Sequence, residues 1–317
     1  MKRTFRRAKA LYAANISTTD NNNQEPKEPN MKTTDPITLL RGESKKDSLQ
    51  KKVCQSMKLI ESLYTGTEIV AHSGGKDSVV LADLVQRVFG SGVVPIVHAV
   101  TTRDPAGTLS FLKENYPDIV LDMPSTNFGE LVRKKGYPTR MTRFCCEKLK
   151  ERVGKGKRMF EGMRAAESGK RAAYEPETCD MRKGYKGTVH LLPLLHWTEK
   201  DIWTYIRFYG LPYMKYYDAP YCLKRHGCVA CPLAYWKHRV AEYRIFPKWA
   251  LADIRNIEVY MNTHPHTKLA EVCDNPEEAF FNWVWQGGYL EELKRSKMAL
   301  FRLDAKEIIN RELDLTL

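Results

Sequence analysis

The stretch Ile69-Val70-Ala71-His72-Ser73-Gly74-Gly75-Lys76-Asp77-Ser78-Val79-Val80-Leu81 decides how the rest of the chain is interpreted. Its apolar start is followed by a glycine pair, after which Val80, Leu84 and Val88 recur at the spacing of one helical face. The pattern predicts a strand, a loop and a helix. Backbone amides converge at a helix N-terminus, and residues without side chains let an anion lie directly on them. The loop is therefore predicted to bind phosphate.

Glycine pairs also occur in ordinary strand-to-helix turns, where they serve only the turn geometry. Here more polar side chains lie between the two apolar runs than a turn requires, namely Ser73, Lys76, Asp77 and Ser78. The spacing differs from that of the longer Walker loop. It resembles the Ser-Gly-Gly-x-Asp-Ser pyrophosphate loop of the adenine-nucleotide α-hydrolases, a superfamily that includes ATP pyrophosphatases and the adenylyl-sulfate and phosphoadenylyl-sulfate reductases.

Length and composition limit the class of protein. The chain has 317 residues, 43% of them hydrophobic, which suffices for one large domain with extensions. No apolar run approaches the length that crosses a bilayer, and no apolar signal segment follows the basic N-terminus, so we expect a cytoplasmic protein without a membrane partner. In that setting the eight cysteines are expected to bind metal or to stay reduced.

Positive charge is concentrated in two segments. The net charge is +13; residues 1–58 hold 13 Lys and Arg against 6 Asp and Glu, and residues 140–171 hold 11 against 4. A basic face attracts nucleotides or a nucleic-acid backbone, although the N-terminal charges fit a solvated surface equally well. We interpret the internal cluster as functional, because it surrounds the motifs described below.

The order of elements predicts an α/β fold with an open, mainly parallel sheet, helices on both faces and a helical C-terminal extension. A helix is expected over residues 48–64 and another over 107–115. Strands are expected at 68–72, 93–100, 119–123 and 158–162. Ligands of such sheets bind beyond the carboxyl ends of the strands, where the glycine loop lies. His72 and His98, in or beside strands, are interpreted as structural.

Composition divides the chain into three parts. Residues 1–45 are polar and poorly periodic, and we expect a flexible basic extension. Residues 46–240 are expected to form the nucleotide-binding domain with a cysteine-rich cluster site. Residues 241–317 are expected to be helical, and Asn275-Pro276 has the pattern of a helix N-terminus, with the asparagine as cap and the proline in the first turn.

A second motif follows the strand expected at 158–162. The segment from Gly162 to Arg171 reads Gly-Met-Arg-Ala-Ala-Glu-Ser-Gly-Lys-Arg and resembles the Gly-x-Arg-x-x-Glu-Ser-x-x-Arg motif of the sulfate-nucleotide reductases. Arg164 and Arg171 have forked donors that can clamp phosphate or sulfate oxygens, and Glu167 can orient an arginine or a ribose hydroxyl. We therefore assign these residues to nucleotide binding.

Two further blocks match the same family. Residues 135–150 resemble its Arg-aromatic-Cys segment, and residues 190–213 resemble its block of Pro-Leu, Trp and Asp-Ile-Trp-x-Tyr-Ile. The second block is assigned mostly to packing, with Thr198 as the predicted N-cap of its helix. Four blocks in the family's order cover residues 65–235, and this collinearity makes the resemblance to the phosphoadenosine phosphosulfate (PAPS) and adenylyl-sulfate reductases specific.

Four cysteines form the predicted metal site, namely Cys145, Cys146, Cys228 and Cys231. A Cys-x-x-Cys turn can aim two sulfurs at one point, whereas adjacent cysteines are unusual ligands for tetrahedral zinc. The adenylyl-sulfate reductases hold a 4Fe-4S cluster with a Cys-Cys pair and a distant Cys-x-x-Cys, so the resemblance implies such a cluster. A structural zinc ion and four unligated buried cysteines remain alternatives. Cys222 is a candidate substitute ligand.

The chain departs from the reductases in two places. Their catalytic cysteine lies in a Glu-Cys-Gly-(Leu/Ile)-His tail, whereas no cysteine follows Cys273 in this sequence. Reductases tend to have degenerate loops, whereas Gly74-Gly75-Lys76-Asp77 has the ATP-splitting form. By this resemblance Lys76 neutralises developing charge and Asp77 serves Mg2+. Together with Arg164, they are the expected catalytic residues.

The leading hypothesis is a PAPS-reductase-family ATP pyrophosphatase that carries a 4Fe-4S cluster, binds ATP with Mg2+ and adenylates an acceptor for sulfur transfer. Nucleic acid is the favoured acceptor, and the hypothesis leaves room for a sulfur-donor protein such as a cysteine desulfurase and for an oligomer. The predicted nucleotide site comprises Ser73, Gly74, Gly75, Lys76, Asp77, Ser78, Gly162, Arg164, Glu167 and Arg171. The alternatives are reduction of adenylyl sulfate or its 3′-phosphorylated form with Cys273 as nucleophile, and a non-catalytic nucleotide-binding subunit.

Overall fold

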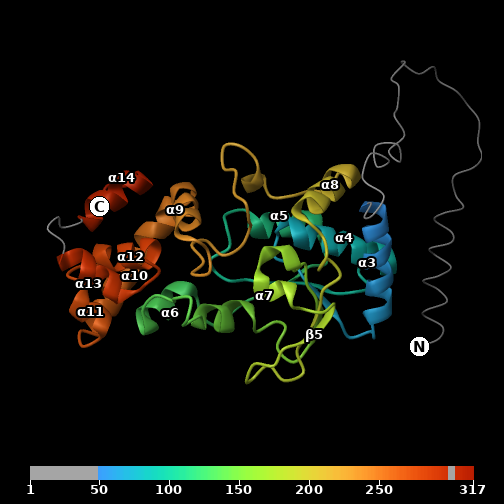
Figure 1. Ribbon diagram of the computed structural model, residues 1–317, viewed down its shortest axis with the longest axis horizontal. Helices are drawn as coiled ribbons and strands as arrows, with labels where there is room; N and C mark the ends of the chain where they lie inside the picture. The colour runs from blue at the N-terminus through green and yellow to red at the C-terminus, as the bar shows by residue number, and fades with distance from the viewer. Residues whose placement is uncertain (1–48, 299–303) are drawn as a thin grey trace, which may run out of the picture.

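A six-stranded sheet and a group of C-terminal helices make up the two halves of the molecule (Figure 1). The computed structural model describes residues 49–298 and 304–317. The extension expected over residues 1–45 lies outside the described residues. Both predicted helices of the N-terminal half are confirmed, since α3 spans Leu49–Leu63 and α5 spans Thr108–Asn115.

The sheet confirms the predicted mainly parallel topology. Its strands are β1 (Ile69–Ala71), β2 (Ile96–Ala99), β3 (Val120–Asp122), β4 (Arg158–Phe160), β5 (Glu177–Cys179) and β6 (Val189–Leu191). Their order in space is β3-β2-β1-β4-β6-β5, and β5 alone among these pairs antiparallel with its neighbour. Strands β2 and β3 follow β1 toward one edge of the sheet, and β6 and β5 lie beyond β4 toward the other edge. Ligands of open parallel sheets bind at such a switch point.

The core of the sheet half follows from the apolar spacing of its helices. The helices are α4 (Lys76–Phe89), α6 (Phe128–Lys135), α7 (Gly169–Ala172) and α8 (Glu199–Tyr209) in addition to α3 and α5. Val80 and Leu84 of α4 are completely buried, as their spacing predicted. Thr198 caps α8 by accepting a hydrogen bond from the Asp201 amide, which confirms the predicted N-cap. Helix α4 packs between α3 and α8 and against β1.

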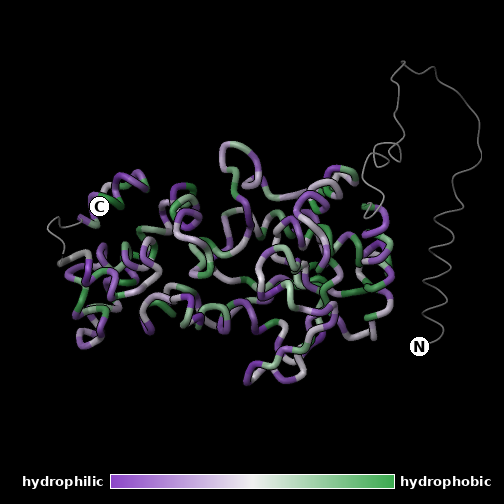
Figure 2. Tube along the Cα trace, viewed as in Figure 1, coloured by the Kyte–Doolittle hydropathy of each residue, from purple (hydrophilic) through white to green (hydrophobic). Residues whose placement is uncertain are grey.

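The C-terminal half is helical, as predicted. It contains α9 (Trp236–Ile245), α10 (Pro247–Thr263), α11 (Lys268–Val272), α12 (Pro276–Trp285), α13 (Leu290–Met298) and α14 (Ala305–Leu313). Asn275 caps α12 and Pro276 occupies its first turn, which confirms that prediction. Hydrophobic and hydrophilic residues alternate along these helices (Figure 2). No helix in the described ranges is long and apolar enough to cross a membrane.

The second hydrophobic core is shared between the two halves. Helix α10 packs against α6 as well as against α12. The core that contains Trp283 and Phe280 of α12 also contains Phe128 of α6 and Cys145 from the predicted metal site. The C-terminal helices therefore support the cysteine segment directly. The domain boundary near residue 240 stays a prediction.

Candidate functional site

The glycine loop lies between β1 and α4, at the carboxyl edge of the sheet. Gly74 has a φ of +80°, a conformation that favours glycine, and the turn is closed by the hydroxyl of Ser78, which donates to the Gly75 carbonyl at 2.8 Å. The Ser73 amide donates to the same hydroxyl at 3.2 Å. The predicted loop residues are thus brought together in one tight turn that leads into the helix.

Three consecutive loop amides each donate to a side chain. The Gly74 amide donates to His72 Nδ1 at 3.1 Å, the Gly75 amide to Ser73 Oγ at 3.3 Å, and the Lys76 amide to the Tyr217 hydroxyl at 3.1 Å. Because these acceptors stand where phosphate oxygens would accept, the loop presents a row of donors suited to an anion.

His72 and Tyr217 are loop contacts that sequence reasoning missed. Burial lowers the pKa of His72 to about 3, so the ring is neutral and its Nδ1 can accept the Gly74 hydrogen bond. Its Nε2 is buried without a hydrogen-bond partner. This contact is compatible with the interpretation of His72 as a structural residue, which stays a prediction. Nothing in the sequence near Tyr217, 141 positions from Lys76, could indicate its contact.

Lys76 is buried beside two carboxylates. Its Nζ lies 3.2 Å from Asp77 Oδ2 and 3.8 Å from Glu199 Oε1, and 5.5 Å from the centre of the Tyr217 ring. The side chain is only 5% exposed. A buried cation held at the loop by flexible partners can transfer its contacts to phosphate oxygens, which are stronger acceptors. The position suits the predicted role of Lys76, which stays a prediction.

An ion pair joins the loop to the second motif. Arg164 Nε lies 2.5 Å from Asp77 Oδ1, and both side chains are largely buried. Glu167 accepts hydrogen bonds from the Arg164 amide, at 3.0 Å, and from the Arg171 guanidinium. Gly162 packs so closely on the loop that a Cβ there would lie 2.9 Å from the Asp77 carbonyl. The two motifs therefore meet at the switch point between β1 and β4.

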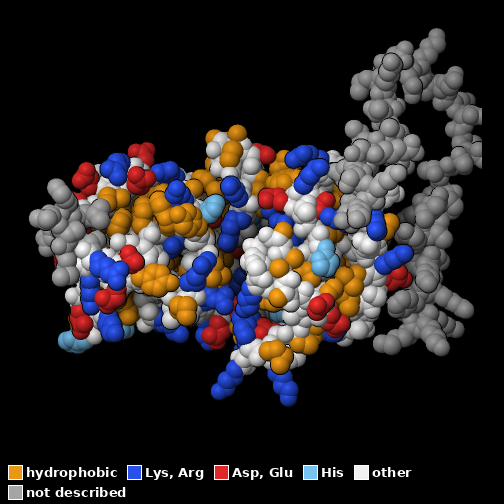
Figure 3. Space-filling view, in the orientation of Figure 1, with side chains coloured by type: hydrophobic (Ala, Val, Ile, Leu, Met, Phe, Trp, Pro, Cys, Tyr) orange, Lys and Arg blue, Asp and Glu red, His pale blue; other side chains and the backbone are white. Residues whose placement is uncertain are grey.

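The internal basic segment is partly neutralised. Five of its Lys and Arg side chains pair with carboxylates, namely Lys148, Arg152, Arg158, Arg164 and Arg171. Lys and Arg side chains still gather along the middle of the face shown in Figure 3, where the sheet half meets the C-terminal helices. Residues 140–171 therefore contain several local ion pairs, which reduce the net charge that this segment presents.

The four predicted metal ligands line one cavity. Cys145 and Cys146 come from the start of a short helical turn (Cys146–Lys150), and Cys228 and Cys231 from the Cys-x-x-Cys turn. A hydrogen bond between the adjacent thiols raises the pKa of Cys145 and lowers that of Cys146 to about 7, while burial raises the pKa of Cys228 to about 11.

Four thiols at one cavity are a donor set that suits an iron–sulfur cluster or zinc. Within residues 49–298 and 304–317, however, no three His, Cys, Asp or Glu side chains converge closely enough to hold a metal ion. The residue types and their location therefore fit the predicted group, but the side-chain positions do not form a finished ligand shell.

Buried charges hold the Cys-x-x-Cys turn in place. Arg103 donates from Nε and Nη2 to the Val229 carbonyl, at 3.2 and 3.0 Å, and pairs with Asp253 of α10 at 2.9 Å. Glu242 of α9 accepts from the Ala230 amide at 2.7 Å. Sequence analysis did not identify these residues. Val229 and Asp253 lie more than a hundred positions from Arg103, and Glu242 lies on a helix that had been assigned no contact with the cysteines.

The remaining candidate cysteines lie elsewhere. Cys222 is exposed and lines a separate pocket beside α8, so it does not join the four-cysteine cavity. Cys273 is buried in the core of the C-terminal helices, with 3% of its surface exposed.

Residues 67–234, more than half of the chain, match the family model of the phosphoadenosine phosphosulfate reductase domain. An uncharacterized protein of Methanocaldococcus jannaschii is 29% identical over 225 residues, which cover 64% of this chain and 53% of that protein. Adenosine 5′-phosphosulfate reductase 2 of Bacillus subtilis is 28% identical over 53% of this chain and 74% of that enzyme. The chain thus spans about half the length of the first of these relatives.

A solved structure is also similar in part. The U34-tRNA thiolase of Methanococcus maripaludis, determined with its 4Fe-4S cluster, aligns with a TM-score of 0.37 at 15% identity, over 69% of this chain and 80% of that chain.

Proposed function

The chain belongs to the phosphoadenosine phosphosulfate reductase family, and we propose that within this family it acts as an ATP pyrophosphatase that adenylates an acceptor for sulfur transfer. The proposed acceptor is a nucleic acid, and the four cysteines are proposed to hold a 4Fe-4S cluster. One observation carries the proposal: the complete Gly-Gly-Lys-Asp loop offers a row of amide donors and a buried lysine at the switch point, joined to Arg164 through Asp77.

The chemistry follows from where these groups lie. The loop amides and Lys76 would hold the β- and γ-phosphates, whose charge they complement. An acceptor oxygen then forms a bond to the α-phosphorus, and the bond from that phosphorus to the bridging oxygen breaks, with its electron pair leaving on pyrophosphate. Lys76 stabilises the charge that develops there. The adenylated oxygen is then a good leaving group: a sulfide sulfur forms a bond to the acceptor atom that carries it, the bond from that atom to the oxygen breaks, and the oxygen leaves with its electron pair as part of AMP.

Asp77 has two cationic neighbours, Lys76 and Arg164. Magnesium, when bound with ATP, would screen the phosphate charge, and Asp77 is the carboxylate placed to serve it. Arg164 keeps Asp77 fixed at the loop through the 2.5 Å contact. Glu167 in turn fixes the Arg164 backbone and the Arg171 guanidinium, so the arginine pair is preorganised for an anionic substrate.

Pyrophosphate release from ATP in the presence of candidate acceptors tests the proposal. Lys76→Met is expected to lower release by about 10²-fold or more, because it removes a buried charge from the developing anion. Lys113→Met, an exposed change on α5, is the matched control and should leave release unchanged. Complete absence of pyrophosphate release with every acceptor tried would rule the activity out.

The cluster has its own test. Anaerobically purified protein is expected to be brown and to contain about four iron atoms per chain. Cys231→Ser should reduce the iron content, whereas Cys179→Ser, an exposed cysteine outside the cavity, should not. Stoichiometric zinc in place of iron would refute the cluster assignment.

A second candidate function is supported by the named relative, adenosine 5′-phosphosulfate reductase 2. Reduction of adenylyl sulfate to sulfite requires a thiolate nucleophile, and Cys273 is the residue proposed for it. Its burial in the C-terminal core counts against that role. Sulfite formation from adenylyl sulfate that is abolished by Cys273→Ser would establish this second function in place of the first.

A further inference from the structure

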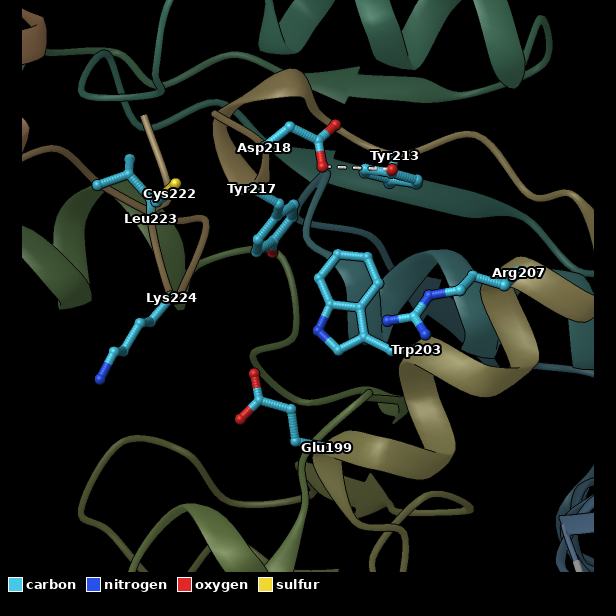
Figure 4. Close-up of a pocket in the computed structure, with 9 residues that line it drawn as sticks. All are labelled: Glu199, Trp203, Arg207, Tyr213, Tyr217, Asp218, Cys222, Leu223 and Lys224. Atoms are coloured by element: carbon cyan, nitrogen blue, oxygen red, sulfur yellow. Dashed lines mark hydrogen bonds between the residues drawn. The ribbon is translucent and has the colours of Figure 1, made fainter. Parts of the chain in front are cut away.

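A pocket of about 330 Å³ opens beside the glycine loop and contains none of the residues predicted for the nucleotide site (Figure 4). One wall is the face of α8 that carries Glu199, Trp203 and Arg207, and the other is the segment 213–224. Its volume is that of a site for a small molecule or for one group of a larger ligand. From the sequence, this part of α8 had been assigned mostly to packing.

Three aromatic rings form the back of this pocket. Trp203 meets Tyr213 and Tyr217 edge to face, with centroid distances of 5.2 Å in both pairs and interplanar angles of 82° and 84°. Figure 4 shows the Trp203 indole standing between Tyr217 and Arg207. The three rings thus pack into one aromatic wall, and aromatic side chains are the usual platforms on which nucleobases stack.

The charged groups of the pocket suit a base that is linked to phosphate. Arg207 and Lys224 are exposed on opposite sides of it and attract phosphate. Glu199 and Asp218 supply carboxylate oxygens, which accept hydrogen bonds from the amino groups of a base.

The pocket is joined to the loop through two residues. The Tyr217 hydroxyl, on the pocket wall, accepts the hydrogen bond of the Lys76 amide, and Glu199 lies 3.8 Å from Lys76 Nζ. A ligand in this pocket therefore lies next to phosphates on the loop.

We propose that this pocket is a nucleobase subsite adjoining the phosphate loop. The base belongs to the acceptor nucleic acid, so the inference rests on the proposed function; the pocket lies outside the residues predicted for the nucleotide, and its two cations are exposed, where a phosphodiester backbone can reach them. The chemistry that the pocket recognises is a planar base with amino groups attached to a phosphorylated sugar.

The test compares Trp203→Leu with Phe208→Leu, which removes a ring 38% exposed from the same helix but outside the pocket. Affinities are measured on the full chain for three probes: α,β-methylene-ATP, short mixed-sequence single-stranded oligonucleotides, and inorganic tripolyphosphate, which has no base. Thermal unfolding verifies that each variant is folded, and Tyr213→Leu is the second variant if Trp203→Leu is not.

Trp203→Leu is expected to weaken binding of the oligonucleotide by about fivefold or more and to leave tripolyphosphate binding unchanged, since stacking is lost and the loop is intact. A loss of oligonucleotide affinity supports the inference, whereas a loss confined to α,β-methylene-ATP would overturn it, because it would assign the pocket to the adenine of the nucleotide. Affinities equal to those of Phe208→Leu for all probes would overturn the inference. Failure of the proposed function is distinct, because it appears as absent pyrophosphate release in the unaltered protein.

Discussion

Gly162→Ala tests the contact between the two sequence motifs. A Cβ at position 162 would lie 2.9 Å from the carbonyl carbon and oxygen of Asp77 and 3.1 Å from the Ser78 nitrogen. Ordinary contacts begin at 3.4 Å, and all three atoms belong to the backbone, which cannot rotate away. The start of α4 or the loop at Gly162 that follows β4 must therefore shift by about 0.5 Å, the difference between 3.4 and 2.9 Å.

This shift has two consequences of different size. Overpacking of a buried contact costs about 1–3 kcal/mol of folding free energy. Because a misplacement of about 1 Å near reacting atoms can cost about 10² in rate, half of that shift at Asp77 is expected to lower pyrophosphate release roughly tenfold. Thermal unfolding measures the first effect, and pyrophosphate release from ATP measures the second.

The matched control is Gly169→Ala, in the same motif, because a Cβ at residue 169 would meet no atom within 4 Å. Gly169→Ala should therefore retain the stability and turnover of the unaltered protein. If Gly162→Ala matched this control in both measurements, the close approach of the motifs and the reasoning drawn from it would be refuted.

Three further predictions follow from individual contacts. Burial raises the pKa of Glu68, but hydrogen bonds, led by that from Arg158, outweigh it and lower the pKa to about 2. Glu68→Gln should therefore cost about 3 kcal/mol of folding free energy at pH 7 and progressively less as the pH falls from about 5 to 2. Urea unfolding at several pH values checks this, and a pH-independent difference would contradict it. Arg103→Lys loses the forked contact with the cysteine turn, so iron content should fall while the charge is kept; unchanged iron would argue against this support. Tyr217→Phe frees the Lys76 amide, so tripolyphosphate affinity should rise about threefold to tenfold by calorimetry, and a fall would show that the hydroxyl assists binding.

The sheet and the loop could be predicted from the sequence because their signals are local. Apolar runs of strand length alternate with helical spacing, and Val80 and Leu84 are buried as that spacing required. Thr198 and Asn275 cap the helices that they were predicted to cap, since capping depends on a side chain and an amide three positions apart.

The resemblance to a known family predicted that distant residues share one site, which local sequence patterns could not indicate. Arg164 is 87 positions from Asp77, yet the two motifs meet in an ion pair at the switch point of the sheet. The two motifs are far apart in the sequence, and they can meet because β4, which precedes the second motif, pairs with β1, which precedes the loop. The same resemblance predicted that Cys145 and Cys231 share one site, and both line one cavity in the structure. Their roles as ligands stay predictions.

Residues that act through long-range contacts were not predictable. Tyr217 reaches the Lys76 amide from a segment without a recognisable motif, and its neighbour Trp203 had been assigned to packing. A tyrosine or tryptophan in a sequence has the same appearance whether it fills a core or lines a pocket. Only the arrangement of the three rings beside the loop distinguishes these outcomes.

The C-terminal helices gain a function from the same kind of contact. Arg103 is only 2% exposed, and a buried guanidinium is costly unless it is paired. Asp253 of α10 supplies the counter-charge, and the pairing leaves Arg103 free to hold the Val229 carbonyl in the middle of the Cys-x-x-Cys turn. Removing α10 would therefore leave an unpaired charge against the cysteine cavity. The C-terminal helices thus support the cysteine site directly, which is why the sheet half alone is not expected to keep the turn in position.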